Sequence, residues 1–180
     1  MLLIGGMPPG RHTEQHDILF AIGNTPKDLV DQINSFWPEA IGRLHIDAWR
    51  EVTSVNGYQI SVVEKPAASA ASANKLFFIN LGGYTKDIFD EQHYVLLSVN
   101  PDSGSAIKNA KQSLFYQHTS FAGAESHIDD KYGIDVDDFY EVEDILLPEQ
   151  KEKYTIQITE AANMPEDEIH LGYFKLNKLP

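Results

Sequence analysis

Two copies of the tripeptide Glu-Gln-His are the residues of this chain best suited to chemistry. They are Glu14-Gln15-His16 and Glu91-Gln92-His93, and each follows a glycine pair, Gly5-Gly6 or Gly82-Gly83, after seven residues. In an extended strand the Glu and His of each copy share one face, about 7 Å apart. We therefore expect a polar ligand-binding site in each copy, with His as an acid, base or ligand and Glu as its partner.

A structural interpretation is the alternative, in which Glu and His only form a hydrogen-bond network that holds a loop. Glycines beside the tripeptides would let backbone or ligand approach closely under either interpretation. The sequence assigns no catalytic residue. The candidate ligand-binding residues are Gly5, Gly6, Glu14, Gln15, His16, Gly82, Gly83, Glu91, Gln92 and His93.

A second repeated pattern could add metal ligands to these sites. His45-Ile46-Asp47 matches His127-Ile128-Asp129, 82 residues later. If these residues converge on the tripeptides, each half offers two imidazoles and two carboxylates, a set that suits Zn²⁺, Mn²⁺ or Fe²⁺. The alternative is a pair of surface loops in which His45, Asp47, His127 and Asp129 cap turns. The acidic stretch 129–138 lacks the spacing of a calcium loop and is expected to be a solvated loop.

The repeated patterns occur in the same order and indicate an internal duplication. The tripeptides are 77 residues apart, and Tyr58–Glu64 resembles Tyr154–Glu160 at an offset of 96 residues. The small polar stretch 65–74 reads as a flexible linker. We therefore predict a first unit at 1–64, a linker at 65–74, and a second unit at 75–180 with insertions and an extra C-terminal strand.

Each unit is predicted to contain two strands, a helix and two further strands. In the first unit, Thr25 and Asp28 can cap a helix that ends at Pro38, and Asn56-Gly57 marks a hairpin turn. In the second unit a helix is expected from about 105 to 116. The expected strands are 2–4, 17–22, 49–52 and 58–63, then 76–81, 94–99, 139–142, 154–159 and 169–176. The predicted fold is α+β, with two tandem β-β-α-β-β units in pseudo-twofold packing and mainly antiparallel sheets, each covered by a helix.

Composition excludes several classes of function. The net charge is −13 and no cluster of Lys and Arg occurs, so a nucleic-acid partner is not expected. The chain has no cysteine, which removes thiolate chemistry, and no apolar run long enough for a membrane span. We expect a cytoplasmic protein, monomeric or homodimeric. Phosphate-loop, dinucleotide and Gly-x-Ser-x-Gly motifs are missing from the sequence.

With the duplicated Gly-Gly…Glu-Gln-His and the His-Ile-Asp pattern, the chain resembles a bacterial family known as domain of unknown function 1543. The resemblance covers most of residues 2–64 and 76–160. It implies one or two copies of this unit per protein, two of them here, and it implies no activity.

The sequence leaves three kinds of function open. The first is a non-enzymatic binding or regulatory domain that recognises a small molecule or a protein through the duplicated site. The second is a hydrolase that uses His and Glu, with or without a divalent metal. The third is a structural partner in an assembly.

Overall fold

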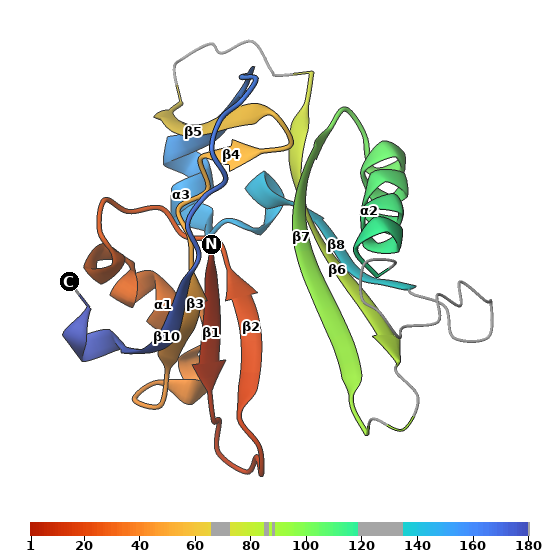
Figure 1. Ribbon diagram of the computed structural model, residues 1–180. Helices are drawn as coiled ribbons and strands as arrows, with labels where there is room; N and C mark the ends of the chain where they lie inside the picture. Colours follow the sequence, from red (N-terminus) through yellow and green to blue (C-terminus); the bar gives the residue numbers. More distant parts are fainter. Residues whose placement is uncertain (66–72, 85–86, 88, 119–134, 180) are drawn as a thin grey trace. The chain divides into compact units, whose positions relative to one another are not determined.

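The computed structural model describes residues 1–65, 73–84, 87, 89–118 and 135–179, and the chain forms two compact units (Figure 1). The first unit combines Met1–Ser69 with Ile145–Pro180, and the second is Ala70–Asp144. The predicted second unit at 75–180 is therefore wrong in its last part. Residues 145–180, including the extra C-terminal strand, belong to the first unit because they pair with its strands.

The main sheet of the first unit is antiparallel, with the strand order β10-β3-β1-β2. Its strands are β1 (Leu2–Gly6), β2 (Gln15–Leu19), β3 (His45–Trp49) and β10 (His170–Lys175). The strand predicted at 49–52 is found nearer the N-terminus, since β3 begins at His45 and ends at Trp49. His45 and Asp47 are therefore strand residues, and the alternative in which they cap a loop is wrong.

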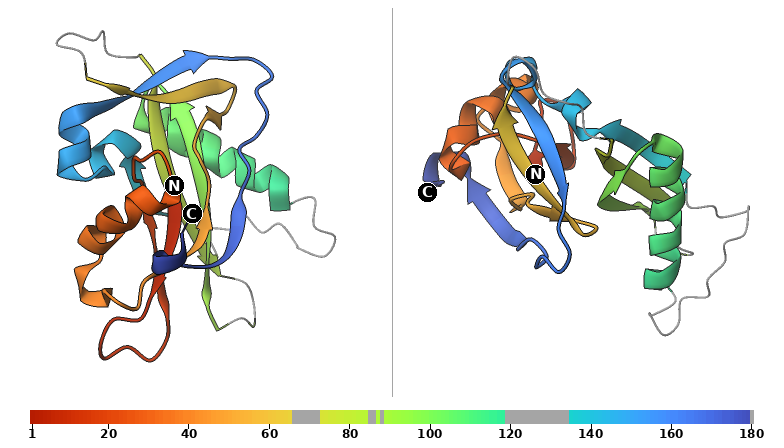
Figure 2. Two further views of the ribbon diagram at one scale, coloured as in Figure 1. Left: turned by 90° about the vertical axis from the view of Figure 1, so that its left-hand side faces the viewer. Right: turned by 90° about the horizontal axis from the view of Figure 1, so that it is seen from above.

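One face of this sheet packs against the helix α1 (Val30–Phe36), which follows the 3-10 turn η1 (Pro26–Leu29) (Figure 2). The predicted cap is present, because the backbone amide of Thr25 donates to a carboxylate oxygen of Asp28 at 2.9 Å. The 3-10 turn η2 (Pro38–Ala40) follows the helix. The buried core consists of Leu2, Ile4, Leu19, Ile33, Ala40, Leu44, Ile46 and Leu179.

A smaller antiparallel sheet completes the first unit, with the order β4-β5-β9. Its strands are β4 (Ser54–Val55), β5 (Tyr58–Glu64) and β9 (Tyr154–Glu160). The hairpin at Asn56-Gly57 is confirmed, with positive φ at both residues. The two segments that the sequence suggests as equivalent copies, β5 and β9, pair with each other along their whole length.

The second unit has one antiparallel sheet, ordered β7-β6-β8, with α2 (Ser103–His118) against one face (Figures 1 and 2). Its strands are β6 (Lys75–Tyr84), β7 (Glu91–Asn100) and β8 (Asp135–Glu141). Phe77, Ile79 and Leu81 of β6 alternate toward the helix and pack with its alanines at 106 and 110. The remaining short helices are η3 (Val142–Ile145), α3 (Pro148–Lys153) and η4 (Leu176–Lys178).

The α+β class and the mainly antiparallel sheets are confirmed, and each main sheet carries a helix on one face. The predicted pseudo-twofold packing of the two units stays a prediction. In the part of the chain that the structure describes, no helix has both the length and the apolar character to cross a membrane.

Candidate metal centre

A glycine at the middle of the first sheet has a histidine on each side. Gly5 of β1 pairs with His16 of β2 and with His45 of β3. Residues that are directly opposite on neighbouring strands place their side chains on the same face. Ile46 alternates with His45 and lies in the core under α1. The two imidazoles therefore stand on the sheet face away from the helix, with only glycine between their strands.

Two carboxylates complete this cluster of four side chains, which we call cluster 1. Nε2 of His45 lies 3.2 Å from Oε1 of Glu14 and 3.2 Å from Oδ1 of Asp47. Nε2 of His16 lies 3.1 Å from Oδ2 of Asp47 and 3.8 Å from Oε2 of Glu14. The structure thus brings the first tripeptide together with the His-Ile-Asp segment.

Gly5 leaves the space into which these side chains fold. A Cβ atom on this residue would lie 2.8 Å from Cε1 of His45, and closer still to Nε2 of His45 and to Oδ2 of Asp47. Any larger residue would displace the imidazole or the carboxylate. The neighbouring Gly6 faces the core, where its Cβ would meet Leu44. Gly6 and its strand partner Gln15 are thus outside the cluster.

Irregular strand pairing gives Asp47 its position. Leu3 and Ile4 of β1 pair with Ala48 and Ile46, so Asp47 between them has no partner and forms a β-bulge. On its other side, Gly172 and Tyr173 of β10 interrupt the pairing at the same level, and Gly172 has a φ of 152°. Such a backbone favours glycine.

The bulge in β10 brings Tyr173 over the cluster. Its ring centroid lies 4.1 Å from that of His45, which is only 2% exposed. Tyr173 itself is 63% exposed, so its ring lies between the buried imidazole and the solvent.

Several polar atoms of cluster 1 are buried without a hydrogen bond. Both ring nitrogens of His45 and Oδ2 of Asp47 have no accessible surface and no aligned hydrogen-bond partner. Nε2 of His45 thus lies 3.2 Å from an oxygen of each carboxylate without an aligned hydrogen bond to either. Each unsatisfied buried group costs about 1–3 kcal/mol. A cation bound among these side chains would give such groups a partner.

The nitrogen–oxygen separations in cluster 1 run from 3.1 to 3.8 Å, and each imidazole approaches its own pair of carboxylate oxygens, Oε1 and Oδ1 for His45 and Oε2 and Oδ2 for His16. No three of these four side chains offer ligand atoms that all lie within 4.8 Å of one another, so a cation shared by the cluster would draw them closer together. Two imidazole nitrogens and two carboxylates form a donor set for Zn²⁺, Mn²⁺ or Fe²⁺.

The second unit repeats this construction around Gly82. Gly82 of β6 pairs with His93 of β7 and with Asp135 of β8, and a bulge leaves Asp137 unpaired. Nε2 of His93 lies 3.3 Å from Oδ2 of Asp137 and 4.0 Å from Oε2 of Glu91. These three side chains, which we call cluster 2, offer ligand atoms that all lie within 4.8 Å of one another.

Gly82 has the same role as Gly5, since its Cβ would lie 2.6 Å from Cγ of Asp137. Gly83 pairs with Gln92, one position further along the strand, so neither residue belongs to cluster 2.

The strand register corrects the sequence match in the second copy. The positions that correspond to His45 and Asp47 are Asp135 and Asp137, in a segment expected to be a solvated loop. His127 and Asp129 lie outside the described residues. Asp137 was therefore missed. The signal that could have found it is Asp135-Val136-Asp137, which keeps the apolar middle and the final aspartate of His45-Ile46-Asp47.

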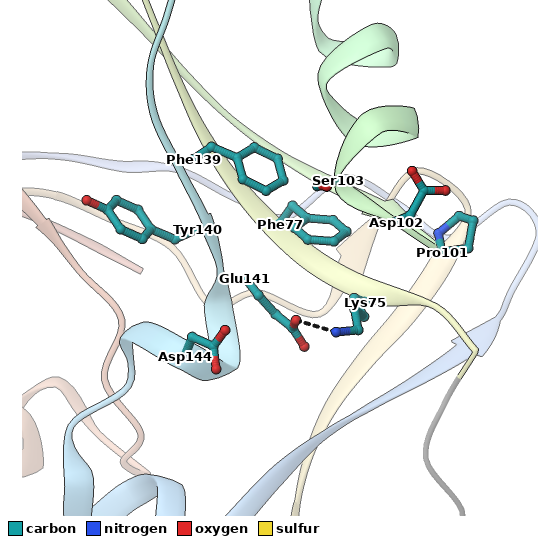
Figure 3. A pocket seen from close by; sticks show the side chains of 9 residues that line it. All are labelled: Lys75, Phe77, Pro101, Asp102, Ser103, Phe139, Tyr140, Glu141 and Asp144. Carbon is teal, nitrogen blue, oxygen red and sulfur yellow. Dashed lines mark hydrogen bonds and ion pairs between the residues drawn. The ribbon is translucent and has the colours of Figure 1, made fainter.

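A hollow of about 470 Å³ in the second unit is lined by residues that belong to neither cluster (Figure 3). Within it, Nζ of Lys75 donates to Glu141 at 2.6 Å, and this contact raises the pKa of Lys75. The enzyme hypothesis requires His16 or His93 to line a concave pocket, and neither lines this one. The lining residues are Lys75, Phe77, Pro101, Asp102, Ser103, Phe139, Tyr140, Glu141 and Asp144.

A protein-family model matches the segment of the chain that contains cluster 1. Residues 11–62 match the family model described as Domain of Unknown Function (DUF1543). The expected family resemblance is confirmed for this segment, which contains all four side chains of cluster 1. No curated protein matches the chain.

A solved structure, that of a protein Il1583 from Idiomarina loihiensis, is similar to the chain with a TM-score of 0.66 and 19% identity. The match covers 97% of this chain and 94% of that one. At this level of identity the likeness concerns the fold alone.

Proposed function

We propose that this protein is a binding domain whose ligand is a divalent transition-metal ion, held by Glu14, His16, His45 and Asp47. The observation that carries the proposal is the burial of His45. Its imidazole is 2% exposed, lacks a hydrogen bond at either nitrogen, and lies 3.2 Å from each of two carboxylates. A cation at this place would satisfy a nitrogen lone pair and both acids together.

The charges of cluster 1 favour an ion with a double positive charge. Two carboxylates balance such an ion, while the two neutral imidazoles supply nitrogen donors without added charge. The net charge of −13 raises the local concentration of cations near the surface. Two imidazoles favour Zn²⁺ or another transition metal over Mg²⁺ and Ca²⁺, which prefer oxygen ligands.

The test is the stabilisation of the full chain by zinc. At a free zinc concentration of 100 Kd, binding adds about 2.7 kcal/mol to the free energy of unfolding. For a chain of this size that raises Tm by roughly 5–11 °C. In a chain that also carries His93→Gln, which removes cluster 2, His45→Gln should abolish this shift. The matched control is His12→Gln, since His12 is an exposed residue outside the cluster and its replacement should leave the zinc shift intact.

Two results would refute the proposal. One is a wild-type chain that binds neither zinc nor another divalent ion in equilibrium dialysis. The other is an unchanged zinc shift when His45→Gln is added to His93→Gln. Circular dichroism of the variant without metal separates loss of the ligand from loss of the fold.

A metal-dependent hydrolase is the second candidate, and the exposure of cluster 1 favours it. The side chains of Glu14 and His16 are each 43% exposed, so an ion held there would face solvent and could keep a water ligand. Chromogenic carboxylate and phosphate esters offered to the zinc-loaded chain test this function. Hydrolysis that disappears in Glu14→Gln would favour the enzyme, and the binding function predicts no turnover.

A further inference from the structure

We infer that the two clusters are separate metal centres with different ion preferences. Cluster 1 would be rich in nitrogen donors and selective for Zn²⁺, and cluster 2 would be rich in oxygen donors and more tolerant of Mn²⁺. This inference rests on the proposed function and extends it to the second unit.

Cluster 2 has the same construction as cluster 1. In both, a glycine on the middle strand pairs with a histidine on one neighbour and with an Asp or His on the other. In both, a bulged aspartate two residues further along comes to the same glycine, Asp47 at Gly5 and Asp137 at Gly82. β-Bulges are over-represented next to functional sites, where they redirect a side chain.

One position separates the two donor sets. His45 stands opposite Gly5, whereas Asp135 stands opposite Gly82. Among the described residues, cluster 2 therefore contains a single imidazole, that of His93, with the carboxylates of Glu91 and Asp137. The strand position that His45 holds in the first unit is thus held in the second unit by a residue type without an imidazole. Carboxylate and water ligands suit manganese, and imidazole suits zinc.

The two clusters also differ in their access to water. In cluster 1 the imidazole of His45 is buried under Tyr173. In cluster 2 all three side chains are partly exposed, His93 at 46%, Glu91 at 35% and Asp137 at 30%. An ion at the open cluster can keep several water ligands, which favours an oxygen-rich coordination sphere.

The measurable quantity is the ratio of zinc affinity to manganese affinity at each cluster. Zinc binds more tightly than manganese to almost any protein site, so absolute affinity does not discriminate between the two clusters. A nitrogen-rich cluster should widen the gap between the two metals. We expect the ratio at cluster 1 to exceed that at cluster 2 by at least tenfold.

Each cluster can be measured alone in the full chain. His93→Gln inactivates cluster 2 and leaves cluster 1, while His16→Gln does the reverse. Isothermal titration with ZnCl₂ and MnCl₂, supported by electron paramagnetic resonance of bound Mn²⁺, gives the two affinities in each background. The exchange variants are His45→Asp in the first background and Asp135→His in the second. His45→Asp should lower the zinc-to-manganese ratio at least tenfold, and Asp135→His should raise it by a similar factor.

The outcomes separate this inference from the proposed function. Stoichiometric binding at both clusters with ratios that agree within threefold would overturn the inference and leave the function standing. Binding at cluster 1 alone would do the same. If neither background binds zinc or manganese, the proposed function fails as well. A raised zinc preference in Asp135→His cannot come from misfolding. The result for this variant therefore stays informative even if the other variants unfold.

Discussion

Replacement of Gly5 by alanine is the most direct perturbation of cluster 1. The added Cβ would lie 2.8 Å from Cε1 of His45 and closer to two potential ligand atoms, where an ordinary contact begins at 3.4 Å. His45 is packed under Tyr173 and has little freedom to retreat. Distances between a metal and its ligands tolerate about 0.2 Å. The required movement is larger, so at least one of the four ligands should be lost.

The magnitude follows from the loss of that ligand. We expect zinc affinity to fall at least tenfold, which at the original 100 Kd reduces the zinc stabilisation from about 2.7 to about 1.4 kcal/mol. The zinc-induced rise in Tm should then shrink by roughly 3–5 °C. Crowding by the methyl group should also destabilise the chain without metal by about 1–3 kcal/mol.

Gly6→Ala is the matched control, because Gly6 is the next residue on the same strand and faces the opposite side. Its Cβ would lie 2.9 Å from Cδ2 of Leu44, in the core. Thermal unfolding with and without zinc should show a lower metal-free Tm for both variants. Only Gly5→Ala should show a smaller zinc shift than the wild-type chain. Equal zinc shifts in the two variants would refute the reasoning.

Three further perturbations test other parts of the first unit. Tyr173→Ala should uncover His45 and speed zinc release to a chelator at least tenfold, measured by stopped-flow. Asp167→Ala should cost about 1.5–3 kcal/mol in urea unfolding, because this carboxylate accepts two backbone amides and a threonine hydroxyl at the start of β4. The amino group of Met1 donates to the carbonyl of Arg50 at 3.1 Å, and burial, then the charge of Arg50, lower its pKa from 8.0 to about 5. The unfolded chain therefore binds the proton more tightly, and the free energy of unfolding should rise between pH 5 and pH 8 by at most about 4 kcal/mol, then level off.

Each of these predictions has its own control. Tyr173→Phe keeps the ring and should release zinc at the wild-type rate; fast release in both variants would contradict a shielding role. Glu166→Ala changes an exposed neighbour and should leave the urea midpoint unchanged. One residue added before Met1 turns the amine into a peptide N–H and moves its charge into solvent, so the rise with pH should shrink. An identical pH profile would show that the amine is not its source.

Local patterns in the sequence predicted the local structure well. The cap at Thr25 and Asp28, the hairpin at Asn56-Gly57 and the helices of both units are present, because each depends on neighbouring residues. The glycine pairs stand opposite the Glu-Gln-His tripeptides in both sheets, as a short hairpin requires. Two of the four members of cluster 1, Glu14 and His16, could therefore be predicted from their short sequence distance to Gly5.

The tertiary structure alone decided what distant segments do. A strand carries no local mark of its partner, so the pairing of β10 with β3 and of β9 with β5 could not be read from sequence, and residues 145–180 were assigned to the wrong unit. The choice of Asp137 depends on strand register, in which a shift of one residue moves every side chain to the other face. The amino-acid sequence determined which donor residues exist and which glycines leave them room. Long-range pairing and two bulged aspartates decided which of those donors meet.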